Sequence, residues 1–213
     1  RATTRSTALL LFMLSTTADA NPTGGVVTHG SATINYGTNM TVDIGSSNVI
    51  INWDQFGIGN AERLDFLNMA SDWRVLNRVT GDAGSFLRGT MTAGGHVYII
   101  NRNGITFNSN AVMNVGRLYA ATGDLSDADF LGGIDRFTNL SDTAQITFRP
   151  GSSFIANELH FVGGSAANAI LVRPDAVVEA PIISMSTGND EVLISRLGER
   201  IHLRLDGTDM DPQ

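Results

Sequence analysis

A repeat of 24 residues in the second half of the chain constrains the fold more than any other feature. The segment 146–164 aligns with the segment 170–188 when the sequence is shifted by 24 positions. The two copies share five identities, at Ile146, Arg149, Pro150, Ala156 and Gly164 of the first copy. Apolar positions also coincide, Phe148 with Val172 and Phe154 with Val178. A fixed period of this length is typical of architectures in which each repeat is one stacked structural unit.

A fainter copy lies upstream at an offset of 41 positions, where residues 105–107 match residues 146–148 and Leu118 matches Leu159. The difference, 41 − 24 = 17 residues, predicts a loop inserted at about 124–142. Within it, Ser126 and Asp129 have the Ser-x-x-Asp form of a helix N-cap. We expect one short helical turn that carries Phe130 and Leu131 back onto the main body.

The repeat units consist of short strands separated by glycine- and proline-marked corners, with no helix of ten or more residues between them. This pattern predicts an all-β fold, a parallel β-helix in which equivalent strands stack about 4.8 Å apart. Phe148 should then lie under Val172, and Phe154 under Val178. An antiparallel sandwich with coincidental spacing is the alternative.

The segments outside the repeats have distinct expected roles. Residues 26–58 alternate β-branched and polar residues and predict strands that form an N-terminal β cap, in which Trp53 is buried. Residues 61–68 predict one or two helical turns. Residues 191–205 still alternate, but no clear closing element follows. We therefore expect a piece of a longer protein or a degenerate copy.

The first twenty residues have the features of a signal peptide. Arg1 and Arg5 precede the apolar run 8–14, and a small-residue site at Ala18 and Ala20 follows. The run is too short to span a bilayer, which takes about 20 apolar residues. We expect residues 1–20 to be removed at this site and residues 21–213 to form one domain. No stable membrane insertion is expected.

Composition and motif searches argue against most catalytic and binding chemistry. The chain has no cysteine, and 14 basic against 21 acidic residues give a net charge of −7, which disfavours nucleic-acid binding. The four histidines are dispersed, and we expect no catalytic residue, metal or cofactor. The acidic loop is expected to be solvated, with calcium as the weaker alternative; its members are Asp124, Asp127, Asp129 and Asp135. A secreted β-helix enzyme that cleaves polysaccharide, as a lyase or hydrolase, remains the second functional hypothesis.

Four blocks in the first half of the chain carry a family resemblance. They are IINWDQFGIG at 50–59, VLNRVTG at 75–81, VYIINRNGI at 97–105 and DADFL at 127–131. In order and spacing they resemble the haemagglutination-activity domain at the start of filamentous-haemagglutinin-like exoproteins of two-partner secretion. Four blocks in register are far more specific than any single one.

The resemblance implies a right-handed parallel β-helix, a single-stranded solenoid with an N-terminal β cap. It implies a secretion-targeting domain that crosses the inner membrane by its signal peptide. In the periplasm an outer-membrane β-barrel transporter would recognise it through periplasmic domains and export it to the cell surface or medium. Host-cell or surface ligands would be bound by a C-terminal body beyond this chain.

The resemblance also suggests which residues the transporter reads. We carry over Asn101, Asn103 and Gly104 from the third block, and Asn77 and Arg78 from the second. The family has Asn-Pro-Asn-Gly where this chain has Arg102 between the two asparagines, which costs about 0.5–1 kcal/mol of preorganisation. The alternative, that the turn 101–104 only caps a coil, is equally open from the sequence.

Overall fold

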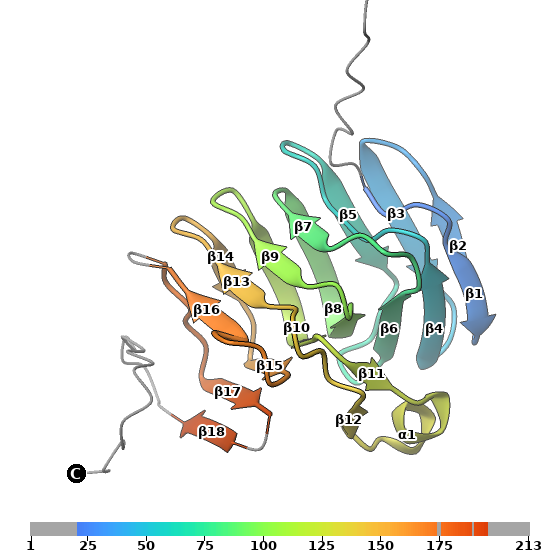
Figure 1. Cartoon of the computed structure of the whole chain (residues 1–213). Coiled ribbons are helices and arrows are strands. Elements are labelled where there is room, and N and C mark those ends of the chain that lie inside the picture. The colour runs from blue at the N-terminus through green and yellow to red at the C-terminus, as the bar shows by residue number, and fades with distance from the viewer. Residues whose placement is uncertain (1–20, 174–175, 189, 196–213) are drawn as a thin grey trace, which may run out of the picture.

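The computed structural model describes residues 21–173, 176–188 and 190–195. Over these residues the chain forms a parallel β-helix of about six coils, which confirms the expected fold class. Figure 1 shows the coils stacked from the N-terminal strands to β17 and β18. Among the described residues, no helix has the length and apolar character that crossing a membrane would require.

Each coil runs over three faces, which we name A, B and C. Face A consists of β3 (Asn39–Ile44), β5 (Arg63–Leu67), the first parts of β8 (Thr90–Ile100) and β10 (Val112–Ala121), and β14 (Ser153–Ile155). Face B consists of β4 (Asn48–Trp53), β6 (Arg74–Val79), the second parts of β8 and β10, β15 (Glu158–Gly163) and β17 (Ile182–Thr187). Face C consists of β7 (Ser85–Leu87), β9 (Ile105–Phe107), β13 (Ile146–Phe148) and β16 (Ile170–Val172).

Antiparallel strands are confined to the ends of the stack and to the insertion. β1 (Val26–His29) pairs with β4 and β2 (Ala32–Asn35) pairs with β3, so these two strands cover the edge of the first coil as the expected cap. β3 and β4, which the sequence also assigned to the cap, already belong to that coil. At the other end, β18 (Asp190–Ser195) pairs antiparallel with β17.

The register of the coils is the one that the repeat predicts. Phe148 pairs with Val172, Ile105 with Ile146, and Leu118 with Leu159. The stacked rings of Phe107 and Phe148 lie 5.2 Å apart inside the tube. Val178 is buried in the same core as Phe154, although no strand pairing joins these two residues.

The corner between faces A and B needs glycine in the third and fourth coils. A Cβ on Gly116 would lie 2.8 Å from the carbonyl oxygen of Gly95 and 2.9 Å from that of Gly94. The backbones of neighbouring coils therefore approach each other here more closely than any side chain would allow. The strand pairing slips at the same place, between Val115 and Arg117.

The expectation of helical turns at 61–68 is wrong, because this segment contains strand β5. Leu64 and Phe66 point into the core while Arg63 and Asp65 face out, an alternation with the period of a strand. Ala61 and Asn68, which flank the strand, have positive φ angles of 63° and 57°. Tight turns at both ends thus leave room for a strand and for no helix.

The insertion lies against the outside of face B and builds a second core (Figure 1). It contains β11 (Asp124–Leu125), α1 (Asp127–Gly132) and β12 (Phe137–Thr138). The predicted N-cap is confirmed, since Ser126 Oγ accepts a hydrogen bond from the Asp129 N–H. Phe130 is fully buried against Tyr98, but Leu131 is 37% exposed, so only one of the two expected anchors packs.

We predict that Leu118→Ala costs about 2–5 kcal/mol of unfolding free energy, because Leu118 is a central rung of the inner core and its removal leaves a cavity. Urea denaturation measures the loss. Asn114→Ala, on the exposed side of the same strand, is the matched control and should change stability by less than about 0.5 kcal/mol. Equal losses in the two variants would contradict the assignment of an inner core.

Candidate functional site

The four sequence blocks, far apart along the chain, meet at the corner between faces B and C. We call this region the block corner and define it as Trp53, residues 77–81, residues 101–104 and Asp127. Trp53 Nε1 donates to Asn77 Oδ1 at 3.0 Å, which joins the first block to the second. Asn103 Nδ2 donates to the Gly81 carbonyl at 2.9 Å, which joins the third to the second. Arg78 reaches Asp127 of the fourth block at 2.7 Å.

Asn77 occupies a position inside the tube that is otherwise apolar. It pairs with Ile51 below and Ile99 above, and it is 0% exposed. Its amide is satisfied on both sides, because Oδ1 accepts from Trp53 and Nδ2 donates to the Tyr98 carbonyl at 3.1 Å. A buried amide is tolerated only with such partners, so Asn77 fixes the position of Trp53 relative to β8.

Asn101 holds the turn that follows β8. Its side chain is 0% exposed, and Nδ2 donates to the Ala83 carbonyl at 3.0 Å and to Ser85 Oγ at 2.9 Å. Its Oδ1 accepts from the Asn103 N–H at 2.8 Å. The Asn101 amide therefore ties the turn both to itself and to the coil below.

The turn 101–104 closes with a hydrogen bond of 3.2 Å from the Gly104 N–H to the Asn101 carbonyl. Arg102 stands at the second position, where a β-turn favours proline, which accounts for the proline of the family. Gly104 has a φ of +106°. Within the Asn103-Gly104 pair the positive φ is therefore confined to the glycine.

Arg78 fastens the insertion to the tube. It donates to the Leu125 carbonyl at 2.6 Å and to Asp127 Oδ1 at 2.7 Å, and its Nε lies 3.3 Å from Asp124 Oδ1. Arg74 lies four residues earlier on β6 and points to the same side of the strand. It donates to the Phe130 carbonyl and lies 4.8 Å above the centre of the Phe130 ring. Sequence reasoning missed Arg74 because its partner is 56 residues away.

The predicted site residues thus divide by exposure. Asn77, Asn101 and Gly104 are buried, Arg78 is half-buried, and Asn103 is exposed next to the exposed Arg102. Ala18 and Ala20 lie outside the described residues.

The acidic residues of the insertion are engaged in local contacts. Asp124 and Asp127 pair with Arg78. Asp129 Oδ2 accepts a hydrogen bond from Ser126 Oγ and Asp129 lies 3.6 Å from Arg136, while Asp135 accepts a hydrogen bond from Tyr98. In the described part of the chain, no group of three or more histidine or acidic residues is arranged to hold a metal ion.

The other edge of face B carries a ladder of two arginines and a histidine on its outer surface. Arg74, His96 and Arg117 occupy the same rung position in successive coils. Burial lowers the pKa of His96, and the neighbouring charges of Arg117 and Arg74 lower it further, whereas Glu158 and Asp135 oppose the shift. The folded protein therefore favours a neutral imidazole at this position.

Comparison with known proteins assigns most of the chain to one family. Residues 18–202 match the family described as the TPS secretion domain. Two heme/hemopexin-binding proteins of Haemophilus influenzae are 36% identical over 177 residues and 34% identical over 110 residues. These matches cover 82% and 52% of this chain but only 19% and 11% of the relatives, so the chain spans a fifth of their length or less.

A solved structure agrees with the fold. The crystal structure of the HMW1 secretion domain from Haemophilus influenzae superposes with a TM-score of 0.60 at 26% sequence identity. The superposition covers 82% of this chain and 46% of that one.

We predict that Asn101→Ala lowers the unfolding free energy by about 1–3 kcal/mol, because it leaves the buried partners of the amide without a hydrogen bond. Asn103→Ala is the control within the same turn and should cost less, since its side chain is exposed and loses one bond. Thermal or urea unfolding of both variants checks the order, and a larger loss for Asn103→Ala would refute the structural role of Asn101.

The ladder of Arg74, His96 and Arg117 predicts a pH dependence of stability. Because the pKa of His96 is lowered on folding from about 6.5, the unfolded chain binds the proton more readily, and stability falls as the pH drops below that value. The contribution of His96 to the free energy of unfolding is fully lost once the pH is below the pKa of His96 in the folded protein. Urea denaturation at about pH 7.5 and 5.5 should show a larger decrease for the wild type than for His96→Gln. Identical decreases would disprove the contribution of His96.

Proposed function

The chain belongs to the TPS secretion-domain family, and from this premise we propose that its block corner is the surface that an outer-membrane transporter recognises. A domain of this family is a non-enzymatic targeting domain that directs the exoprotein carrying it to export by a two-partner system. Interaction with a transporter in the outer membrane follows from this role. What the family does not specify is which side chains the transporter contacts.

The convergence of the four blocks on one corner supports this location. Residues that resemble the family over more than seventy positions of sequence are joined there by direct hydrogen bonds and an ion pair. We propose two roles within the corner. Arg102 and Asn103 are exposed and contact the transporter, whereas Asn77, Arg78, Asn101 and Gly104 position them.

The boundary of the mature domain is also a proposal. Asn21 is 7% exposed, and its Nδ2 donates to the carbonyls of Gly37 at 2.8 Å and Thr38 at 3.0 Å. Asn21, the first described residue, is therefore already part of the folded body. This supports removal of residues 1–20 as a signal peptide and a mature domain from residue 21 onward.

The remaining partners belong to the wider exoprotein. We propose that periplasmic domains of the transporter make the contact and that ligands of the exoprotein bind outside this domain. The two Haemophilus relatives are named for binding heme/hemopexin, and this chain matches only 19% and 11% of them. No feature of the described residues favours the alternative of a polysaccharide-cleaving enzyme.

Charge reversal at the turn tests the proposed contact. Arg102→Glu should reduce export by the matching transporter at least about tenfold, a loss of about 1.4 kcal/mol in recognition, while the variant folds normally. Export is measured as the secreted fraction in cells with and without the transporter, and folding by circular dichroism of the purified domain.

Arg149→Glu is the matched control, because Arg149 is an exposed arginine at a different corner of the tube. It should be exported like the wild type. If Arg102→Glu and Arg149→Glu are exported equally, the exposed turn is not the contact. If the wild type is exported equally without the transporter, the targeting role itself is refuted.

A further inference from the structure

Three rings form a continuous stack on the outer surface of face B. Tyr98, Tyr119 and His160 occupy the same rung in three successive coils. The rings of Tyr98 and Tyr119 lie 4.2 Å apart and 3° from parallel, and those of Tyr119 and His160 lie 4.5 Å apart and 14° from parallel. In the next coil the paired residue is Ser184, which has no ring. The stack therefore ends at the imidazole.

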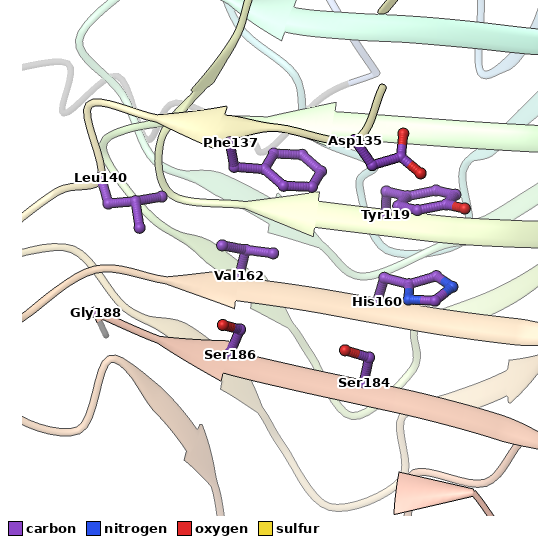
Figure 2. Close-up of a pocket in the computed structure, with 9 residues that line it drawn as sticks. All are labelled: Tyr119, Asp135, Phe137, Leu140, His160, Val162, Ser184, Ser186 and Gly188. Atoms are coloured by element: carbon purple, nitrogen blue, oxygen red, sulfur yellow. The ribbon is translucent and has the colours of Figure 1, made fainter. Parts of the chain in front are cut away.

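A surface hollow of about 340 Å³ lies where the stack ends. Figure 2 shows Tyr119, His160 and Ser184 projecting to one side from neighbouring strands, with Asp135 and Phe137 of the insertion facing them. Its volume is at the lower end of the range of about 300–1,000 Å³ for small-molecule sites, which suits a single ring-sized group. Neither face B nor the insertion alone would form this hollow.

The parts of the hollow are held in place by hydrogen bonds. Tyr98 Oη donates to Asp135 Oδ1 at 2.9 Å, which fixes the insertion to the first ring of the stack. His160 Nε2 lies 3.1 Å from Glu158 Oε2, and Glu158 in turn pairs with Arg117 at 2.8 Å. The imidazole plane is therefore oriented before any ligand arrives, which lowers the entropic cost of binding.

We propose that this hollow binds a planar aromatic ring. The ring continues the stack above His160 in the space over Ser184, at the spacing of the rings below it. Phe137 and Val162 line the hollow beside it and offer apolar contacts. A phenol or indole, free or as the side chain of a peptide, has this chemistry.

Charge and lining narrow the ligand class further. Asp135 and the net charge of −7 disfavour an anionic ring. Asp135 is also the single carboxylate among the residues that line the hollow. Cleavage of a glycosidic bond takes a pair of carboxylates, so the site is one of binding.

Tyramine, a phenol with a positively charged amine, is the probe for the test. We expect a titration of the full chain with tyramine, followed by NMR, to shift the ring signals of His160 and Tyr119. His160→Ala should weaken binding about two- to tenfold, the effect of losing one stacked ring, and His160→Phe should retain it. Absence of shifts at saturating tyramine would overturn the proposal.

Ser184→Trp supplies the missing ring from the chain itself and should abolish tyramine binding. Ser153→Trp, the same change on the exposed side of a face A strand, is the matched control and should bind like the wild type. Equal binding by these two variants would place the ligand elsewhere and refute the site.

Two further probes separate the sources of the ring. Binding of the peptide Gly-Tyr-Gly in addition to tyramine would identify an exposed aromatic side chain as the ligand, and binding of tyramine alone a free small molecule. Glucose should not bind, and equal shifts with glucose and tyramine would identify a saccharide site and overturn the aromatic one.

Discussion

In-register stacking of inward-facing apolar side chains is the interaction on which the rest of this structure depends. One ladder runs through the whole tube: Val49, Val75, Val97, Leu118, Leu159 and Ile183. Every rung is almost completely buried. Because side chains alternate between the faces of a strand, a slip of one residue would turn each rung toward solvent. The register is therefore fixed by burial, and the parallel hydrogen bonds between coils follow from it.

The polar exceptions to this core lie at the block corner. Asn77 interrupts an inner ladder between Ile51 and Ile99, and its amide is satisfied by Trp53 and the backbone of β8. Asn101 is also buried, and its amide bonds the turn 101–104 to Ala83 and Ser85 of the coil below. Buried amides with full sets of partners specify one arrangement of the surrounding strands at little net gain in stability. They hold the exposed Arg102–Asn103 pair at a fixed place on an otherwise repetitive surface.

The insertion gives the tube a feature that coil-on-coil growth alone would not provide. It leaves the stack after β10 and folds back onto β6, β8 and β10, where Phe130 and the two arginines of β6 hold it. One edge of the insertion completes the second core, and the other borders the open end of the ring stack. A solenoid whose coils contact only their neighbours can form progressively, one coil on the next.

The sequence by itself determined the repeat and hence the coil register, the capped turn of α1, the burial of Trp53 and the position of the insertion. These features depend on contacts within one coil or on a period that is visible as spacing. It did not determine that 61–68 is a strand, that Asn77 and Asn101 are buried, that Arg74 and Arg78 clamp the insertion, or that three rings stack. Each of these depends on which side chain lies one coil away, and that neighbour is set by tertiary stacking across twenty or more residues. The tertiary structure therefore decided which motif residues are scaffold and which are surface, because an identical polar side chain serves either role according to the coil above and below it.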